Sequence, residues 1–154
     1  MAILPEERIE NVKRALFDFI ETNYTLTTKW FQGSNVLDTT AITEWVWFGI
    51  TGSDRRFLRH VRRENLGNLV TFFVSAIVYI KPTETITRID LIRDTIVNLL
   101  RRASVQVVDR VGSAGNLGKL YGKELLSDIP LGIEDDLDRL SLTFAMEYIE
   151  EFSK

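Results

Sequence analysis

The feature that most constrains the fold is the apolar run from Leu69 to Ile80, LVTFFVSAIVYI. Its aromatic and β-branched residues indicate a β-strand, and apolar side chains occupy both alternating positions along it. Twelve residues would span about 40 Å at about 3.3 Å per residue, well beyond the usual length of about five or six. A membrane-spanning helix needs roughly 20. The run therefore predicts a long strand, covered on both faces and projecting in part beyond its own core, and no membrane anchor.

The other apolar patterns predict two helices and three further strands. An amphipathic helix is expected to begin near Pro5, because the first turn of a helix tolerates the N–H that proline lacks. Three glutamates follow, and their negative charge is stabilising near the positive N-terminal end of the helix dipole. A second helix follows Thr87 as its N-cap and closes at Arg102. The order helix, strand, strand, helix, strand, strand indicates an α+β fold, an antiparallel or mixed sheet of about four strands with two packed helices. The additional strands are expected over residues 42–51, 105–111 and 140–149.

Two polar segments are predicted to be loops. Residues 23–38 are rich in threonine and asparagine, which is typical of a loop with room for one short strand. Residues 112–118, GSAGNLG, form a glycine-rich loop. Although GSAGNLGKL contains Gly-Lys, Ser113 stands where a phosphate-binding P-loop needs glycine, and Leu120 where it needs serine or threonine. The second segment therefore predicts a connection and not a nucleotide site.

Composition is typical of a folded protein with one domain spanning residues 1–154. Hydrophobic residues make up 45% and charged residues 27% of the 154 residues. The chain has no cysteine, which excludes disulfides, zinc–thiolate sites and thiol nucleophiles and fits a reducing compartment. Acidic residues in MAILPEERIE stand where a signal peptide carries basic ones, so we expect no export signal.

No group of residues forms a recognisable catalytic or metal site. The single histidine, His60, lies among arginines, and the sequence has no GxSxG serine for which it could act as base. Glu44 lies on a tryptophan-rich strand without a second acid at a spacing that would make a general acid and base pair. The carboxylates of EDDLD, residues 134–138, lack the spacing of a calcium loop and are typical of a solvated turn or a helix start. We therefore expect neither enzymatic activity nor a cofactor or metal.

A basic stretch, SDRRFLRHVRREN at residues 53–65, contrasts with the formal charge of −3 of the whole chain. It lies in a predicted basic loop at residues 52–67 that is long for a hairpin connection, which indicates a functional or partner-ordered segment. Arginine favours planar, bidentate partners such as carboxylates and phosphates. Residues 54–64 carry +3 and residues 134–139 carry −3, which fits a heterologous contact between copies of the chain. The candidate contact residues are Arg55, Arg56, Arg59, Arg62 and Arg63 on one side and Glu134, Asp135, Asp136 and Asp138 on the other.

Two other interpretations of these charges stay open. The arginines could bind the phosphates of a DNA backbone as well as they could bind carboxylates, because the attraction between arginine and phosphate does not depend on the DNA sequence. Both clusters could also be solvated surface, since isolated surface charges contribute little.

In chain order the segments are an amphipathic helix, the strand EWVWFGI, the arginine-rich connection, LGNLVTFFVSAIVYI, the helix IDLIRDTIVNLLRR, the strand VQVVDRV and the strand LSLTFAMEYIE. This arrangement resembles the tail terminator, or tail-completion, proteins of long-tailed bacteriophages. The resemblance covers nearly the whole chain and rests on pattern and order, not on a diagnostic motif. It implies a structural virion protein that forms a homohexameric ring, caps the tail tube, ends tube polymerisation and provides the head-docking interface.

The same resemblance implies the partners and the location. The partners would be other copies of the chain, the tail tube protein and the head–tail connector protein, with DNA passing through the lumen without specific binding and no membrane involved. The protein would be made in the host cytoplasm and reside at the head–tail interface of the virion. Because DNA must cross the ring with weak contact, we predict that the arginines of residues 53–65 face a protein neighbour and that the lumen is neutral or acidic.

The alternative function is a nucleic-acid-binding module that holds the phosphate backbone with the arginines of residues 53–65. The sequence pI of about 5.3 argues against it, because a dedicated nucleic-acid binder usually has a net basic domain.

Overall fold

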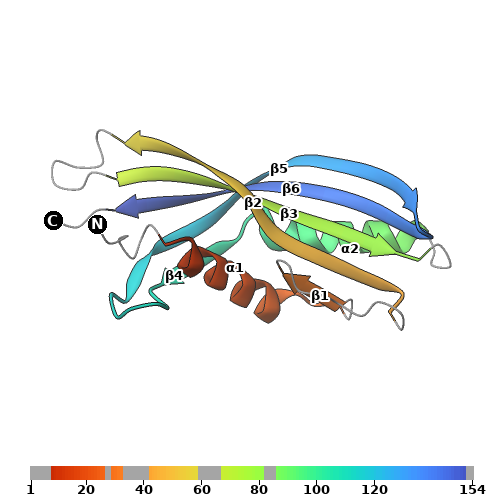
Figure 1. Cartoon of the computed structure of the whole chain (residues 1–154), viewed down its shortest axis with the longest axis horizontal. Helices are drawn as coiled ribbons and strands as arrows, with labels where there is room; N and C mark the ends of the chain where they lie inside the picture. Colours follow the sequence, from red (N-terminus) through yellow and green to blue (C-terminus); the bar gives the residue numbers. More distant parts are fainter. Residues whose placement is uncertain (1–7, 27–28, 33–41, 59–66, 82–85, 152–154) are drawn as a thin grey trace.

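The computed structural model describes residues 8–26, 29–32, 42–58, 67–81 and 86–151. Two helices lie along one face of a long, twisted sheet (Figure 1). In chain order the elements are α1 (Ile9–Asn23), β1 (Lys29–Gln32), β2 (Glu44–Leu58), β3 (Gly67–Ile80), α2 (Ile86–Leu100), β4 (Ser104–Val108), β5 (Asn116–Glu134) and β6 (Leu137–Glu151).

The sheet has the strand order β1-β2-β3-β6-β5-β4. The pairs β2–β3, β3–β6, β6–β5 and β5–β4 are antiparallel, whereas the short strand β1 pairs in parallel with β2. The predicted α+β class with two helices is confirmed. The predicted number of about four strands is too low, because six strands form within the described residues.

One face of the sheet and the inner sides of both helices form the hydrophobic core. Alternate residues of β3 and β6 point into it, because side chains one residue apart on a strand leave on opposite faces. α1 packs against β4, and α2 packs against β3 and β6. Leu16 and Ile20 of α1, and Ile92, Ile96 and Leu100 of α2, recur at the spacing of one helical face and are fully buried. The sheet contributes Val46, Phe48, Val70, Phe72, Val74, Val78, Leu142, Phe144, Met146 and Tyr148.

The opposite face of the sheet carries neither described helix. On it the ring of Trp45 stacks on that of Tyr79, with centroids 5.3 Å apart and an interplanar angle of 16°. The Trp47 ring lies over Gly49, where a Cβ atom would collide with it. Leu69, Phe73 and Ile77 are only half-buried there. The prediction that both faces of the long strand are covered is therefore confirmed for one face only.

The expected projection of this strand beyond its own core is not observed. Val70 and Ile80, near the two ends of β3, are both buried, with exposed fractions of 0% and 3%. Both residues belong to the hydrophobic core, so the inner face is covered at both ends of this run.

Several predicted boundaries differ from the structure, and one lies outside its described residues. β2 continues to Leu58, so residues 53–58 form a strand and not part of a loop at 52–67, while residues 59–66 lie outside the described part. α2 begins at Ile86, which places Thr87 inside the helix. The glycine-rich loop ends at Asn116, where β5 begins, and β5 itself was not predicted. The expected helix start at Pro5 also lies outside the described residues.

Candidate assembly interface

The arginines that the structure describes lie on a strand. Arg55 and Arg56 are exposed on β2, opposite Val70 and Leu69 of β3. The guanidinium of Arg56 is 3.9 Å from the Asp54 carboxylate, and both side chains are more than half exposed, so this pair contributes little stability. The other candidates of the basic stretch, Arg59, Arg62 and Arg63, lie outside the described residues together with His60.

The acidic candidates form a tight hairpin turn. Glu134 ends β5, Asp138 lies on β6, and Asp135 and Asp136 connect the strands with φ angles of 51° and 59°. Two consecutive residues with positive φ make a turn whose twist matches the strands, and aspartate tolerates this conformation. Glu134 also forms an ion pair with Arg139 of the same chain, with 2.8 Å between the carboxylate oxygen and the guanidinium nitrogen. Of the two structures expected at EDDLD, a turn or a helix start, the chain forms the turn.

Of the basic cluster, the two described arginines lie far from the acidic turn of the same chain. Arg55 is level with Val70, whereas Asp138 is level with Ile80 at the other end of β3. Ten residues of strand correspond to about 33 Å. A contact between the clusters of neighbouring copies stays a prediction.

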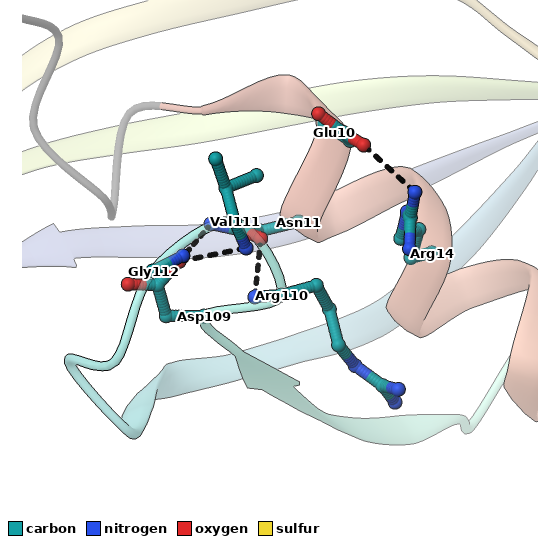
Figure 2. A network of polar contacts seen from close by, with 7 residues as sticks. All are labelled: Glu10, Asn11, Arg14, Asp109, Arg110, Val111 and Gly112. Atoms are coloured by element: carbon teal, nitrogen blue, oxygen red, sulfur yellow. Dashed lines mark hydrogen bonds and ion pairs between the residues drawn. The ribbon is translucent and has the colours of Figure 1, made fainter.

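A buried polar network joins α1 to the end of β4. The Asp109 carboxylate accepts hydrogen bonds from the backbone N–H groups of Val111 at 3.1 Å, Gly112 at 2.9 Å and Ala114 at 3.1 Å. Asn11 donates its side-chain amide to Asp109 at 3.3 Å and accepts from the Arg110 N–H at 2.8 Å (Figure 2). The hydrogen bonds from Gly112 and Ala114 hold the pKa of Asp109 below its ordinary value. The network closes a turn, which is a structural role.

Glu44, the isolated acid of the sequence, is bound inside the subunit. Arg88 of α2 donates to both of its carboxylate oxygens, at 2.6 Å to Oε1 and 2.8 Å to Oε2, and the two side chains are 27% and 13% exposed. Further along the helix, Arg93 pairs with Asp128 of β5, and this hydrogen bond raises the pKa of Arg93. These ion pairs attach α2 to the sheet.

The most unusual surface is the second half of β5, which sequence reasoning missed. β4 pairs with β5 only from Asn116 to Tyr121. Beyond that point, four large apolar side chains are exposed by 41% to 67%. An edge strand with exposed apolar side chains is an association hazard unless a partner covers it. The four residues are Leu126, Ile129, Leu131 and Ile133.

Among the described residues, no three aspartate or glutamate side chains form a group that could hold a metal ion. An open groove between the ends of the helices is lined by residues such as Phe19, Asn23, Asn98 and Arg102, with no carboxylate in the lining. No described helix combines the length and apolar character needed to cross a membrane.

No protein-family model and no curated protein matches the chain. Among solved structures, the chain is similar to one in the virion of a native gene transfer agent particle. The similarity covers 90% of this chain and 94% of that chain, with a TM-score of 0.56 and 16% sequence identity. At this identity the similarity shows a shared fold over nearly the full length of both chains.

Proposed function

We propose that the chain is a structural component of a phage-like virion, where it assembles with copies of itself and with other virion proteins. The observation that carries the proposal is the fold similarity to a chain of a gene transfer agent virion, which extends over nine-tenths of both chains. Coverage of at least nine-tenths of both chains favours a related building block over a shared fragment.

Within such a particle, we propose that the chain forms a homohexameric ring that caps the tail tube, ends tube polymerisation and gives the head a surface on which to dock. The order of the sequence segments supports this role through the resemblance to tail terminators. The subunit also has the features that a ring component needs, because it presents a helix-free sheet face and an exposed apolar edge on β5.

The proposal assigns no catalysis, cofactor or metal to the chain. Several acidic residues that could have served a catalytic or metal site have a structural role. Glu44 forms an ion pair with Arg88, and Glu134 forms one with Arg139. Asp135 and Asp136 form a turn. Carboxylates held in ion pairs and turns favour a structural protein over an enzyme, because an enzyme needs such groups available to its substrate.

Disruption of the coding sequence in the genome that carries it tests the proposal. Electron microscopy of the resulting lysate should show heads and tails that are not joined, and tails of irregular length, with normal particles restored when the chain is supplied in trans. Irregular length is the specific sign of lost tube termination, whereas unjoined tails of normal length would support head docking alone. Infectious particles with tails of normal length would contradict the proposal.

The arginines of residues 53–65 leave the nucleic-acid alternative open to a direct test. DNA retardation should be compared between wild type, an Arg59→Ala, Arg62→Ala, Arg63→Ala variant and an Arg101→Ala, Arg102→Ala control, whose arginines are exposed at the end of α2. Weak binding that is equal in all three proteins is expected for a ring component. Tight wild-type binding that falls steeply with salt and disappears only in the triple variant would favour the backbone-binding function.

A further inference from the structure

The two edge strands, β1 and β4, are short, and each pairs with only part of the longer strand beside it. β1 pairs with β2 from Trp45 to Phe48, and β4 pairs with β5 from Asn116 to Tyr121. Within the described residues, Gly49–Leu58 of β2 and Gly122–Glu134 of β5 therefore have a paired strand on one side only. We call these segments the bare half of β2 and the bare half of β5.

The two bare halves lie toward opposite ends of the sheet. Leu58 is level with Gly67, the first residue of β3, whereas Glu134 is level with Leu137, the first residue of β6. A second copy of the subunit must therefore shift along the strands before its bare half of β2 can meet the bare half of β5. Sheets that close into barrels have this kind of stagger.

The strand directions allow such a contact. β2, β3, β6 and β5 follow one another in antiparallel steps, so β2 and β5 run in opposite directions. If a second copy is placed so that its β2 continues the sheet beyond β5 of the first copy, the strands of both copies keep the same directions. The β2 of one copy would therefore lie antiparallel to the β5 of its neighbour, which is the pairing already used through most of the sheet.

The sheet face and the charge of Arg56 and Glu124 favour one register between β2 of one copy and β5 of the next. Glu124 is level with Ala145 and Phe73, and Arg56 is level with Leu69, all on the helix-free face. Facing residues must share a face, since a slip of one residue would reverse every side chain. Placing Arg56 opposite Glu124 satisfies this rule with a shift of about 13 Å. Beside this pair, Arg55 lies opposite Leu125, and both residues are on the face that the helices cover.

The overall charges of the two edges are complementary. The bare half of β2 carries Asp54, Arg55 and Arg56, a formal charge of +1. The bare half of β5 carries Lys123, Glu124, Asp128 and Glu134, a formal charge of −2. Opposite charges on two edges favour a heterologous contact over the pairing of either edge with itself.

We propose that the bare half of β5 binds the bare half of β2 from a second copy of this chain, with Arg56 opposite Glu124, so that one sheet continues from subunit to subunit. This contact rests on the proposed assembly of the chain with itself and specifies its surface. It would bring Leu126 and Ile129 under cover. It also gives Arg56 a different acceptor from the carboxylates of residues 134–138 that the sequence indicated.

Engineered disulfides test the register, because the natural chain has no cysteine that could interfere. Residues facing each other across an antiparallel pair have Cα atoms about 4.5 to 5.5 Å apart, within the range that a disulfide spans. The test variant combines Arg56→Cys with Glu124→Cys, and the control combines Arg56→Cys with Asp136→Cys. Each variant is oxidised at high concentration and analysed by non-reducing electrophoresis, while light scattering of the reduced protein measures assembly.

The proposal predicts a ladder of covalent dimers, trimers and larger species for the Arg56→Cys, Glu124→Cys variant, lost on reduction. The control pair and each single variant should give no ladder. A ladder from the control pair instead, or dimers from Glu124→Cys alone, would overturn the register or the heterologous contact. Oligomers in light scattering without any ladder would refute this interface and leave the proposed assembly intact. Wild type that stays monomeric at every concentration, again without a ladder, would count against both.

Discussion

Gly122 lies where β5 passes beneath the end of α2, and its replacement should destabilise the subunit. Its N–H donates to the Ala103 carbonyl at 2.8 Å. A Cβ atom at this position would overlap the Leu100 carbonyl oxygen and lie 3.0 Å from the Ala103 nitrogen. Both neighbours are backbone atoms, which cannot rotate away, so Gly122→Ala must move β5 or the end of the helix.

The expected cost follows from these contacts. Overpacking costs about 1 to 3 kcal/mol, and a backbone neighbour places this site near the upper limit. Restricting the unfolded chain returns about 0.5 to 1 kcal/mol. We expect Gly122→Ala to lower the free energy of unfolding by about 2 kcal/mol and the melting temperature by about 4 to 8 °C.

Urea denaturation followed by tryptophan fluorescence measures this change, since the chain has three tryptophans. Gly52→Ala is the matched control on the same sheet, because a Cβ atom there would meet only the Phe73 ring at an ordinary distance of 3.6 Å. The control should be close to wild type or slightly more stable. A Gly122→Ala protein within about 0.5 kcal/mol of the control would refute the close approach of β5 to α2.

The remaining predictions concern two polar contacts of the subunit. The lowered pKa of Asp109 means that its contribution to stability is complete above the ordinary value of 3.8 and is lost as the pH falls through the lower folded-state pKa. Asp109→Asn should therefore be less stable than wild type in urea at pH 7, with the difference shrinking in acid; a constant difference would contradict this. In a double-mutant cycle, Glu44→Ala and Arg88→Ala should couple by about 1 to 3 kcal/mol, and Arg88→Lys should not restore the bidentate contact. Additive effects would show that the ion pair contributes nothing.

The core of the fold could be predicted from the sequence because its strands alternate cleanly. Val46 and Phe48 point inward and Trp45 and Trp47 outward, as the period of two requires. β5 could not be predicted for the opposite reason. Three register shifts interrupt its pairing with β6, so apolar residues such as Leu126 and Leu131 fall out of alternation. Pro130 in the same segment also argues against a strand unless the strand lies at an edge.

The candidate interface was predicted in part. The acidic turn followed from composition, and the structure adds that Asp135 and Asp136 are positioned by turn geometry. Arg55 and Arg56 fall in the predicted loop because the apolar run of this strand ends before Gly52, yet an edge strand accommodates charged side chains. The half-covered edges that carry the proposed contact depend on which strands are neighbours in the sheet, and no local sequence pattern contains that information.

The proposed role is that of a ring-forming building block of a phage-like virion. A cryo-electron microscopy reconstruction of the junction between head and tail, in the particle encoded with this chain, would show whether the ring exists. We predict six copies in a closed ring on the end of the tail tube, with the bare half of β2 in each copy beside the bare half of β5 in the next. A junction built entirely from other proteins, with this chain absent from the particle, would contradict the account.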